Sequence, residues 1–173
     1  PCRAGSRRLL KLDPSENQDS SSSWKGLLEQ GISLFNRRCY AEAVRVFEES
    51  LRRGAVGEEV RCFLAHACVS AGEQCLLAGE LDGAEGCLRR AFQVDAGSAR
   101  GHAVLGALLK ERGHLKRARL EYEEAVRLDP DAVDARLGLA RLLSEEGDRE
   151  GAEAHTRAAV KAGPRASVSI ESI

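Results

Sequence analysis

Apolar and small residues along this chain recur at spacings of three and four, which is the periodicity of amphipathic helices. Between residues 111 and 130, for example, Leu115, Ala118, Tyr122 and Ala125 share one helical face. Short polar breaks, most of them with glycine, separate such stretches. The pattern predicts eight helices, at residues 27–35, 40–51, 58–77, 81–94, 99–111, 115–128, 133–145 and 149–161.

The pattern repeats with a period of about 34 residues, so the chain is predicted to be an array of similar units. The spacing from Ala43 to its counterpart Ala84 is longer than this period by two helical turns. An insertion therefore lies between the first two units, either as a longer loop at 54–59 or as two extra turns on the helix at 58–77. The residues that align at this period are Gly79, Gly113 and Gly147, then Ala84, Ala118 and Ala152, then Ala91, Ala125 and Ala159, and Pro130 with Pro164.

These positions resemble the tetratricopeptide repeat family, whose unit is a pair of antiparallel helices over about 34 residues. The best match is carried by Leu105, Gly106, Leu109, Ala118, Tyr122, Ala125 and Pro130. The resemblance implies an all-α fold, a right-handed α-solenoid of antiparallel helix pairs. About four units are expected, at 24–57, 65–98, 99–132 and 133–166, with an insertion near 54–64.

Both ends of the chain lie outside this pattern. Residues 1–23 are predicted to be a polar, Ser-rich tail or linker, and residues 167–173 a C-terminal tail. The segment LKLDP at 10–14 is similar to VRLDP at 126–130, so residues 1–23 either include the end of a preceding repeat or form a frayed tail. No polar cap follows the last unit, which favours a fragment of a longer protein.

Composition narrows the classes of partner and compartment. The 26 basic and 27 acidic residues give a net charge of −1, which favours neither nucleic acid nor an anionic membrane. No apolar run reaches the ~18 residues of a membrane span. The six cysteines form no CxxC pair and no dense framework, which indicates a reducing, intracellular location, expected to be cytoplasmic.

The resemblance also implies a concave groove, lined by the first helix of each unit, in which a protein or peptide partner lies. Its apolar anchors are expected in the first two units, and Phe35 is favoured because Leu34 beside it already fills a core position. The predicted partner-binding residues are Leu28, Ile32, Phe35, Asn36, His66, Val69, Glu73, Leu76, Arg100 and Lys110. The same projection adds Lys25, Ala103, Ala107, Asp134, Leu137 and Arg141 to the groove.

One kind of ligand is predicted not to bind. Family members that hold the acidic tails of heat-shock chaperones clamp the terminal carboxylate with Lys, Asn and Arg side chains of three successive units. Here the corresponding residues are Leu28, Ile32, Ser70, Arg100 and Val104, of which Arg100 alone could take that role. A carboxylate bound against these mainly apolar side chains would lose its hydration without gaining charge-assisted hydrogen bonds in return.

No catalytic or metal-binding arrangement is predicted. Cys62 and His66 share a helical face, but nothing supplies the remaining ligands that zinc needs. The Glu and Arg residues of the helix at 115–128 have the spacing of a solvated face with ion pairs. We therefore expect a non-enzymatic adaptor or scaffold without a cofactor. The alternative is an internal segment of a longer solenoid, or a scaffold that associates with itself.

Overall fold

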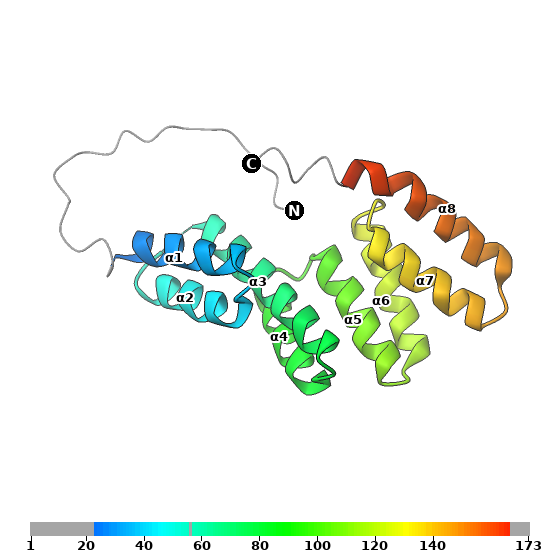
Figure 1. Ribbon diagram of the computed structural model, residues 1–173, viewed down its shortest axis with the longest axis horizontal. Helices are drawn as coiled ribbons and strands as arrows, with labels where there is room; N and C mark the ends of the chain where they lie inside the picture. Colours follow the sequence, from blue (N-terminus) through cyan, green and yellow to red (C-terminus); the bar gives the residue numbers. More distant parts are fainter. Residues whose placement is uncertain (1–22, 56, 167–173) are drawn as a thin grey trace.

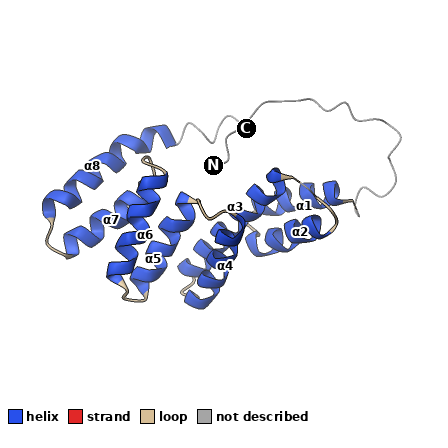
Figure 2. Cartoon of the chain, turned by 180° about the vertical axis from the view of Figure 1, so that it is seen from behind, coloured by secondary structure: helices blue, strands red, loops and turns tan. Residues whose placement is uncertain are grey.

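The computed structural model describes residues 23–55 and 57–166, and all regular secondary structure in these ranges is α-helix (Figure 2). Eight helices follow one another: α1 (Trp24–Asn36), α2 (Tyr40–Arg52), α3 (Glu58–Leu77), α4 (Leu81–Val94), α5 (Ala99–Glu111), α6 (Leu115–Leu128), α7 (Val133–Glu145) and α8 (Arg149–Ala166). The expectations for residues 1–22 and 167–173 fall outside the described residues.

The last helix differs from its prediction, because α8 continues to Ala166 instead of ending at Lys161. The expected stop rested on Pro164. A proline in the last turn removes one helical hydrogen bond, but its fixed φ of about −65° is compatible with a helix. The proline therefore lies within the end of α8 and does not terminate it earlier.

Consecutive helices pack as four pairs, α1 with α2, α3 with α4, α5 with α6, and α7 with α8. The pairs follow one another along the long axis of the molecule (Figure 1). Contacts between pairs run from α2 to α3, α4 to α5 and α6 to α7, and also between the first helices α1, α3, α5 and α7. The all-α array of stacked helix pairs that the sequence predicts is confirmed.

The extra length of the second pair is helical. Helix α3 has 20 residues, whereas α1, α5 and α7 have 13 each. Gly72 of α3 lies against Leu88 of α4 as Gly106 of α5 lies against Tyr122 of α6. Measured from these two glycines, α3 begins two helical turns earlier than α5. The additional turns at its N-terminus therefore give α3 its longer surface.

The turns within the helix pairs share one backbone conformation. Gly79, Gly113 and Gly147 have φ values of 77°, 77° and 87°, in the left-handed region that favours glycine. In each turn, the amide of the next residue donates to a carbonyl of the preceding helix and so satisfies the end of that helix. Arg38 has the same role between α1 and α2, with a φ of 62°.

Two clusters of buried apolar side chains form the core. The first cluster joins α1 to α5 and includes Phe47 and Leu88. The second joins α5 to α8 and includes Tyr122 and Leu142. Leu105 on α5 packs against both clusters. Since α5 contributes to both, the first helices are held side by side, and their remaining faces form the surface considered next.

Candidate functional site

A hollow of about 370 Å³ lies across the first helices α3, α5 and α7. Eight of the twelve residues around it are those that the family resemblance placed in the groove. The lining consists of Glu73, Leu76, Leu77, Arg100, Ala103, Val104, Ala107, Tyr122, Asp134, Leu137, Gly138 and Arg141. The structure therefore brings together the middle and C-terminal parts of the expected groove.

The predicted residues of the first pair do not reach this hollow. Leu28, Ile32 and Phe35 are half-buried and pack against the first core cluster. The Phe35 ring also lies edge-on to Tyr40, with 5.3 Å between ring centroids. Asn36 is exposed at the end of α1. These residues form a separate, more apolar surface at the N-terminal end of the array.

Val69 does not line the groove, and its prediction as an anchor is wrong. The residue is 1% exposed and belongs to the first core cluster. Helix α3 contacts α1, α2, α4 and α5, so it is buried on several faces, and Val69 has no free surface for a partner. His66, one turn earlier, is exposed.

Charges around the hollow are partly neutralised within the protein. Arg100 of α5 donates to the Ser70 hydroxyl at 3.1 Å and pairs with the Glu73 carboxylate of α3. Lys110 lies outside the lining and pairs with Glu145 of α7 at 3.1 Å. The single cation at the chaperone-tail positions, Arg100, is thus already engaged by a carboxylate.

Tyr122 reaches the hollow from α6, behind the first helices. Its ring occupies the space between Gly106 of α5 and Gly138 of α7, where an added Cβ would be 2.8 Å and 2.4 Å from ring atoms. The residue is 4% exposed, and burial raises the pKa of its hydroxyl to about 12. Within the described residues this hydroxyl makes no hydrogen bond.

Sequence reasoning assigned Tyr122 to the framework, which is correct for its ring but overlooks its hydroxyl. The missing signal was the pair of glycines, because the side chain can pass between α5 and α7 only where both helices lack a Cβ. Leu77 was also overlooked. It is 85% exposed at the end of α3 and forms an apolar edge of the hollow.

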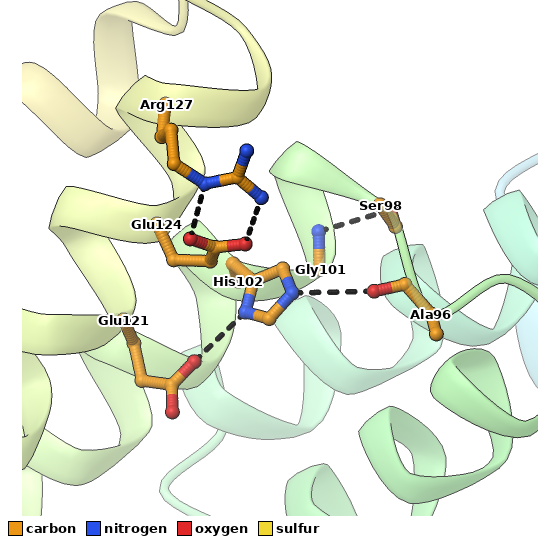
Figure 3. A network of polar contacts seen from close by, with 7 residues as sticks. All are labelled: Ala96, Ser98, Gly101, His102, Glu121, Glu124 and Arg127. Carbon is orange, nitrogen blue, oxygen red and sulfur yellow. Dashed lines mark hydrogen bonds and ion pairs between the residues drawn. The ribbon is translucent and has the colours of Figure 1, made fainter. Parts of the chain in front are cut away.

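The polar residues of α6 on another face bind neighbouring helices and each other (Figure 3). The His102 ring lies 2.8 Å from a Glu121 carboxylate oxygen through Nδ1 and 3.3 Å from the Ala96 carbonyl through Nε2. Arg127 donates twice to Glu124 and lowers the pKa of that carboxyl. The His102–Glu121 contact connects α5 to α6, and the Arg127–Glu124 ion pair lies within α6.

The described ranges 23–55 and 57–166 show neither a metal site nor a membrane span. No group of three His, Cys, Asp or Glu side chains there is placed to hold a metal ion. No helix in these ranges is both long and apolar enough to cross a membrane. Burial raises the pKa of the Cys68 thiol to about 12 and also raises the pKa of Cys87, so both thiols favour the neutral form.

A second hollow, of about 460 Å³, lies between α7 and α8 at the C-terminal end of the array. Two of its residues have counterparts where α7 packs on α5 and α6. Ala140 lies one repeat period after Gly106, and Thr156 lies one repeat period after Tyr122. The full lining is Leu137, Ala140, Arg141, Ser144, Ala152, Glu153, Thr156 and Arg157. This surface of α7 and α8 therefore corresponds to the surface of α5 and α6 on which the next helix packs.

Comparisons with known proteins agree with this architecture. Residues 109–169 match the family model described as tetratricopeptide repeat. No curated protein matches the sequence.

Solved structures show the likeness of fold over most of the chain. A crystal structure of MamA has 17% identity and a TM-score of 0.57, with 84% of this chain and 81% of MamA covered. MamA 41-end from Desulfovibrio magneticus RS-1 has 19% identity and a TM-score of 0.56, with 84% and 78% covered. YrrB, described as a TPR protein with an unusual peptide-binding site, has 21% identity and a TM-score of 0.52, with 83% and 71% covered.

Proposed function

Because the chain has the fold of a tetratricopeptide repeat array and residues 109–169 match that family's model, we propose that it acts as a non-enzymatic adaptor or scaffold that binds a peptide or helix of a protein partner in its concave groove. The hollow across α3, α5 and α7 is the observation that supports this proposal most strongly. A ligand seated there would contact three successive helix pairs at once. The described peptide-binding site of YrrB, which has the same kind of fold, is consistent with this use.

Two surfaces would contribute to binding. Leu28, Ile32 and Phe35 on α1 offer half-buried apolar surface at the N-terminal end of the array, and Leu76 with the exposed Leu77 offers apolar surface at the edge of the hollow. Covering apolar surface contributes roughly 25 cal/mol per Å² before the costs of association are subtracted. Polar contacts would come from Asn36, His66, Glu73, Arg100 and Lys110.

The proposal can be tested by placing a charge on the apolar surface. We expect Ile32→Asp and Phe35→Asp to abolish capture of the partner by the tagged chain, because each would bury an unpaired carboxylate at the interface. Gln30→Asp is the matched control, since Gln30 is exposed on the same helix. Binding partners would be identified by affinity capture and then measured by titration calorimetry.

Leu77→Asp provides a second test that spares the core. Leu77 is 85% exposed, so this substitution leaves the packing of α3 intact, and circular dichroism should be unchanged. Undiminished partner binding by Leu77→Asp and by folded Ile32→Asp or Phe35→Asp would refute apolar anchoring in the groove.

Self-assembly is the second candidate, and the hollow between α7 and α8 favours it. A helix from another copy could pack on this surface as α7 packs on α5 and α6. Thr156→Arg would then block the packing surface, because Thr156 is exposed within its lining. Sedimentation equilibrium should show oligomers that dissociate with this substitution. A strictly monomeric chain over a wide concentration range would rule out self-assembly.

A further inference from the structure

We propose that the hollow across α3, α5 and α7 contains a subsite for an acidic side chain of an extended partner peptide, whose carboxylate accepts hydrogen bonds from the Tyr122 hydroxyl and the Arg141 guanidinium. This inference rests on the proposed function, because it assumes that a peptide enters the groove. It adds the chemical identity of one contact, which the fold does not specify.

The first observation is the Tyr122 hydroxyl. It lines the hollow on a side chain that is 4% exposed, and it has no hydrogen-bond partner among the described residues. The hydroxyl oxygen is not among the buried atoms that lack a partner, so it is accessible from the hollow, and a ligand there can accept its hydrogen bond in place of water. Packing between Gly106 and Gly138 fixes the ring, so little side-chain entropy would be lost when a ligand binds.

The second observation is the cation beside this hydroxyl. Arg141 lies on α7 three residues after Gly138, which places the two on adjacent turns of one helical face. It is exposed, lines the hollow, and forms no ion pair or hydrogen bond within the part of the chain that the structure describes. Burial raises the pKa of Tyr122, the charge of Arg141 lowers it and the charge of Glu111 raises it, so Arg141 acts on this hydroxyl against burial and one carboxylate.

These two donors suit a carboxylate better than other ligand groups. A neutral carbonyl could satisfy the hydroxyl but would leave the guanidinium without a counter-charge, whereas a carboxylate accepts from both through charge-assisted bonds. A doubly charged phosphate is a poorer fit. Of the two lining arginines, Arg100 is already paired with Glu73, so one free cation remains for one negative charge among the described lining residues.

The acidic residues of the lining act against this preference to different degrees. Glu73 is paired with Arg100. Asp134 lies four residues before Gly138 on α7, roughly 6 Å along the helix, and Arg141 lies three residues after it, roughly 4.5 Å. Asp134 therefore repels a carboxylate bound at Tyr122. Asp134 is exposed, so its repulsion is screened by water and salt, whereas Tyr122 and Arg141 donate to the carboxylate directly.

A side chain is favoured over a terminal carboxylate by the continuity of the surface. Leu137 and Arg141 line both this hollow and the one between α7 and α8. A peptide that crosses Arg141 can therefore continue in either direction along the array. Only a side chain has to enter the space above Tyr122.

Selection from a library of short random peptides, displayed as fusions without a free C-terminal carboxylate, tests the proposal on the full 173-residue chain. We expect the selected peptides to share a glutamate or aspartate at one position. A synthetic peptide with blocked ends and that acid replaced by its amide should bind about tenfold more weakly, as expected for loss of a charge-assisted hydrogen bond.

Variants of the protein identify the contact. Tyr122→Phe and Arg141→Gln should each weaken binding of the acidic peptide about tenfold, and should change binding of its amide analogue much less. Tyr122→Phe keeps the ring, so the fold should be retained. The matched control Arg117→Gln changes an exposed arginine of α6 that lines neither hollow, and it should have no effect.

The outcomes separate this inference from the proposed function. Selected peptides that bind through the groove without a shared acid would overturn the acidic subsite alone. Equal losses for the acidic and amide peptides with Tyr122→Phe and Arg141→Gln would do the same. A library that yields no binder would contradict peptide binding in the groove, and the subsite with it.

Discussion

Arg38 holds a turn position that glycine occupies in the other three helix pairs. Its φ of 62° places an L-residue in the left-handed region, whereas Gly79, Gly113 and Gly147 adopt similar values without a Cβ. Such a conformation costs a residue with a Cβ roughly 1–2 kcal/mol. The first turn of the array is therefore more strained than the others.

Replacing this arginine with glycine is expected to stabilise the protein. Arg38→Gly removes the left-handed strain but increases the entropy of the unfolded chain, so the net gain in free energy of unfolding should be about 0.5–1 kcal/mol. Urea denaturation would measure it. Arg37→Gly, at a φ of −82°, is the matched control and should destabilise instead. A loss of stability with Arg38→Gly would contradict the argument from strain.

His155 on α8 makes stability depend on pH. Its Nδ1 atom is buried without a hydrogen-bond partner among the described residues. Burial lowers the pKa of the ring below 6.5, the charges of Arg136 and Arg119 lower it further, and Glu123 opposes them. The unfolded chain therefore binds a proton more readily than the folded protein does.

The sign of the pH dependence follows directly. The contribution of a neutral His155 is present above the unfolded pKa of about 6.5 and is lost as the pH falls through the lower folded value. We expect the free energy of unfolding, measured in urea, to decrease between about pH 7 and about pH 5, and the decrease to be smaller in His155→Gln. His114→Gln, at an exposed histidine, should retain the wild-type decrease. An unchanged decrease in His155→Gln would exclude this residue as its source.

At the scale of elements, two glycines set how closely α5, α6 and α7 approach. Gly106 and Gly138 lie on either side of the Tyr122 ring, so the same contact holds the third and fourth helix pairs together and directs a hydroxyl to the hollow. Packing and the candidate site therefore depend on one arrangement. A change that separates α6 from α7 should alter both.

Gly138→Ala tests this contact. The new Cβ would lie 2.4 Å from the Tyr122 ring, so we expect a loss of about 1–3 kcal/mol in the free energy of unfolding from overpacking. Gly86→Ala is the matched control, because Gly86 is exposed within α4 and nothing lies within 4 Å of an added Cβ. It should gain about 0.5–1 kcal/mol from helix propensity. Urea denaturation would compare the two variants, and stabilisation by both would show that α7 can move away freely.

Most of the helices could be predicted from the sequence because they bury one periodic face, and the repeat period predicts which helices form a pair. The same alignment of the repeats also predicted eight of the twelve residues that line the hollow. Val69 could not be placed correctly, because α3 is buried on several faces and its apolar residues mark no single exposed side. The role of Tyr122 depends on glycines of two different helices, a contact in space that periodicity along one helix does not reveal.

At the scale of the whole molecule, stability is distributed along the array. The helices contact neighbours in the same or the adjacent pair, and the two core clusters share α5. In such an array, stability approximates a sum of terms for each unit and each interface between units. Local opening of one half can therefore occur while the other half remains folded.

Two equivalent cavities should reveal this independence. Leu88 in the first cluster and Leu142 in the second are each 1% exposed, and truncation of either to alanine should cost about 2–5 kcal/mol. In native-state hydrogen exchange, we expect Leu142→Ala to lower amide protection mainly in α6, α7 and α8, and Leu88→Ala mainly in α3 and α4. Equal loss of protection along all eight described helices in both variants would mean that the array unfolds as one cooperative unit. In that case the groove would open only by global unfolding. If the two halves open independently, α7 on one side of the groove can move while α3 on the other side stays in place.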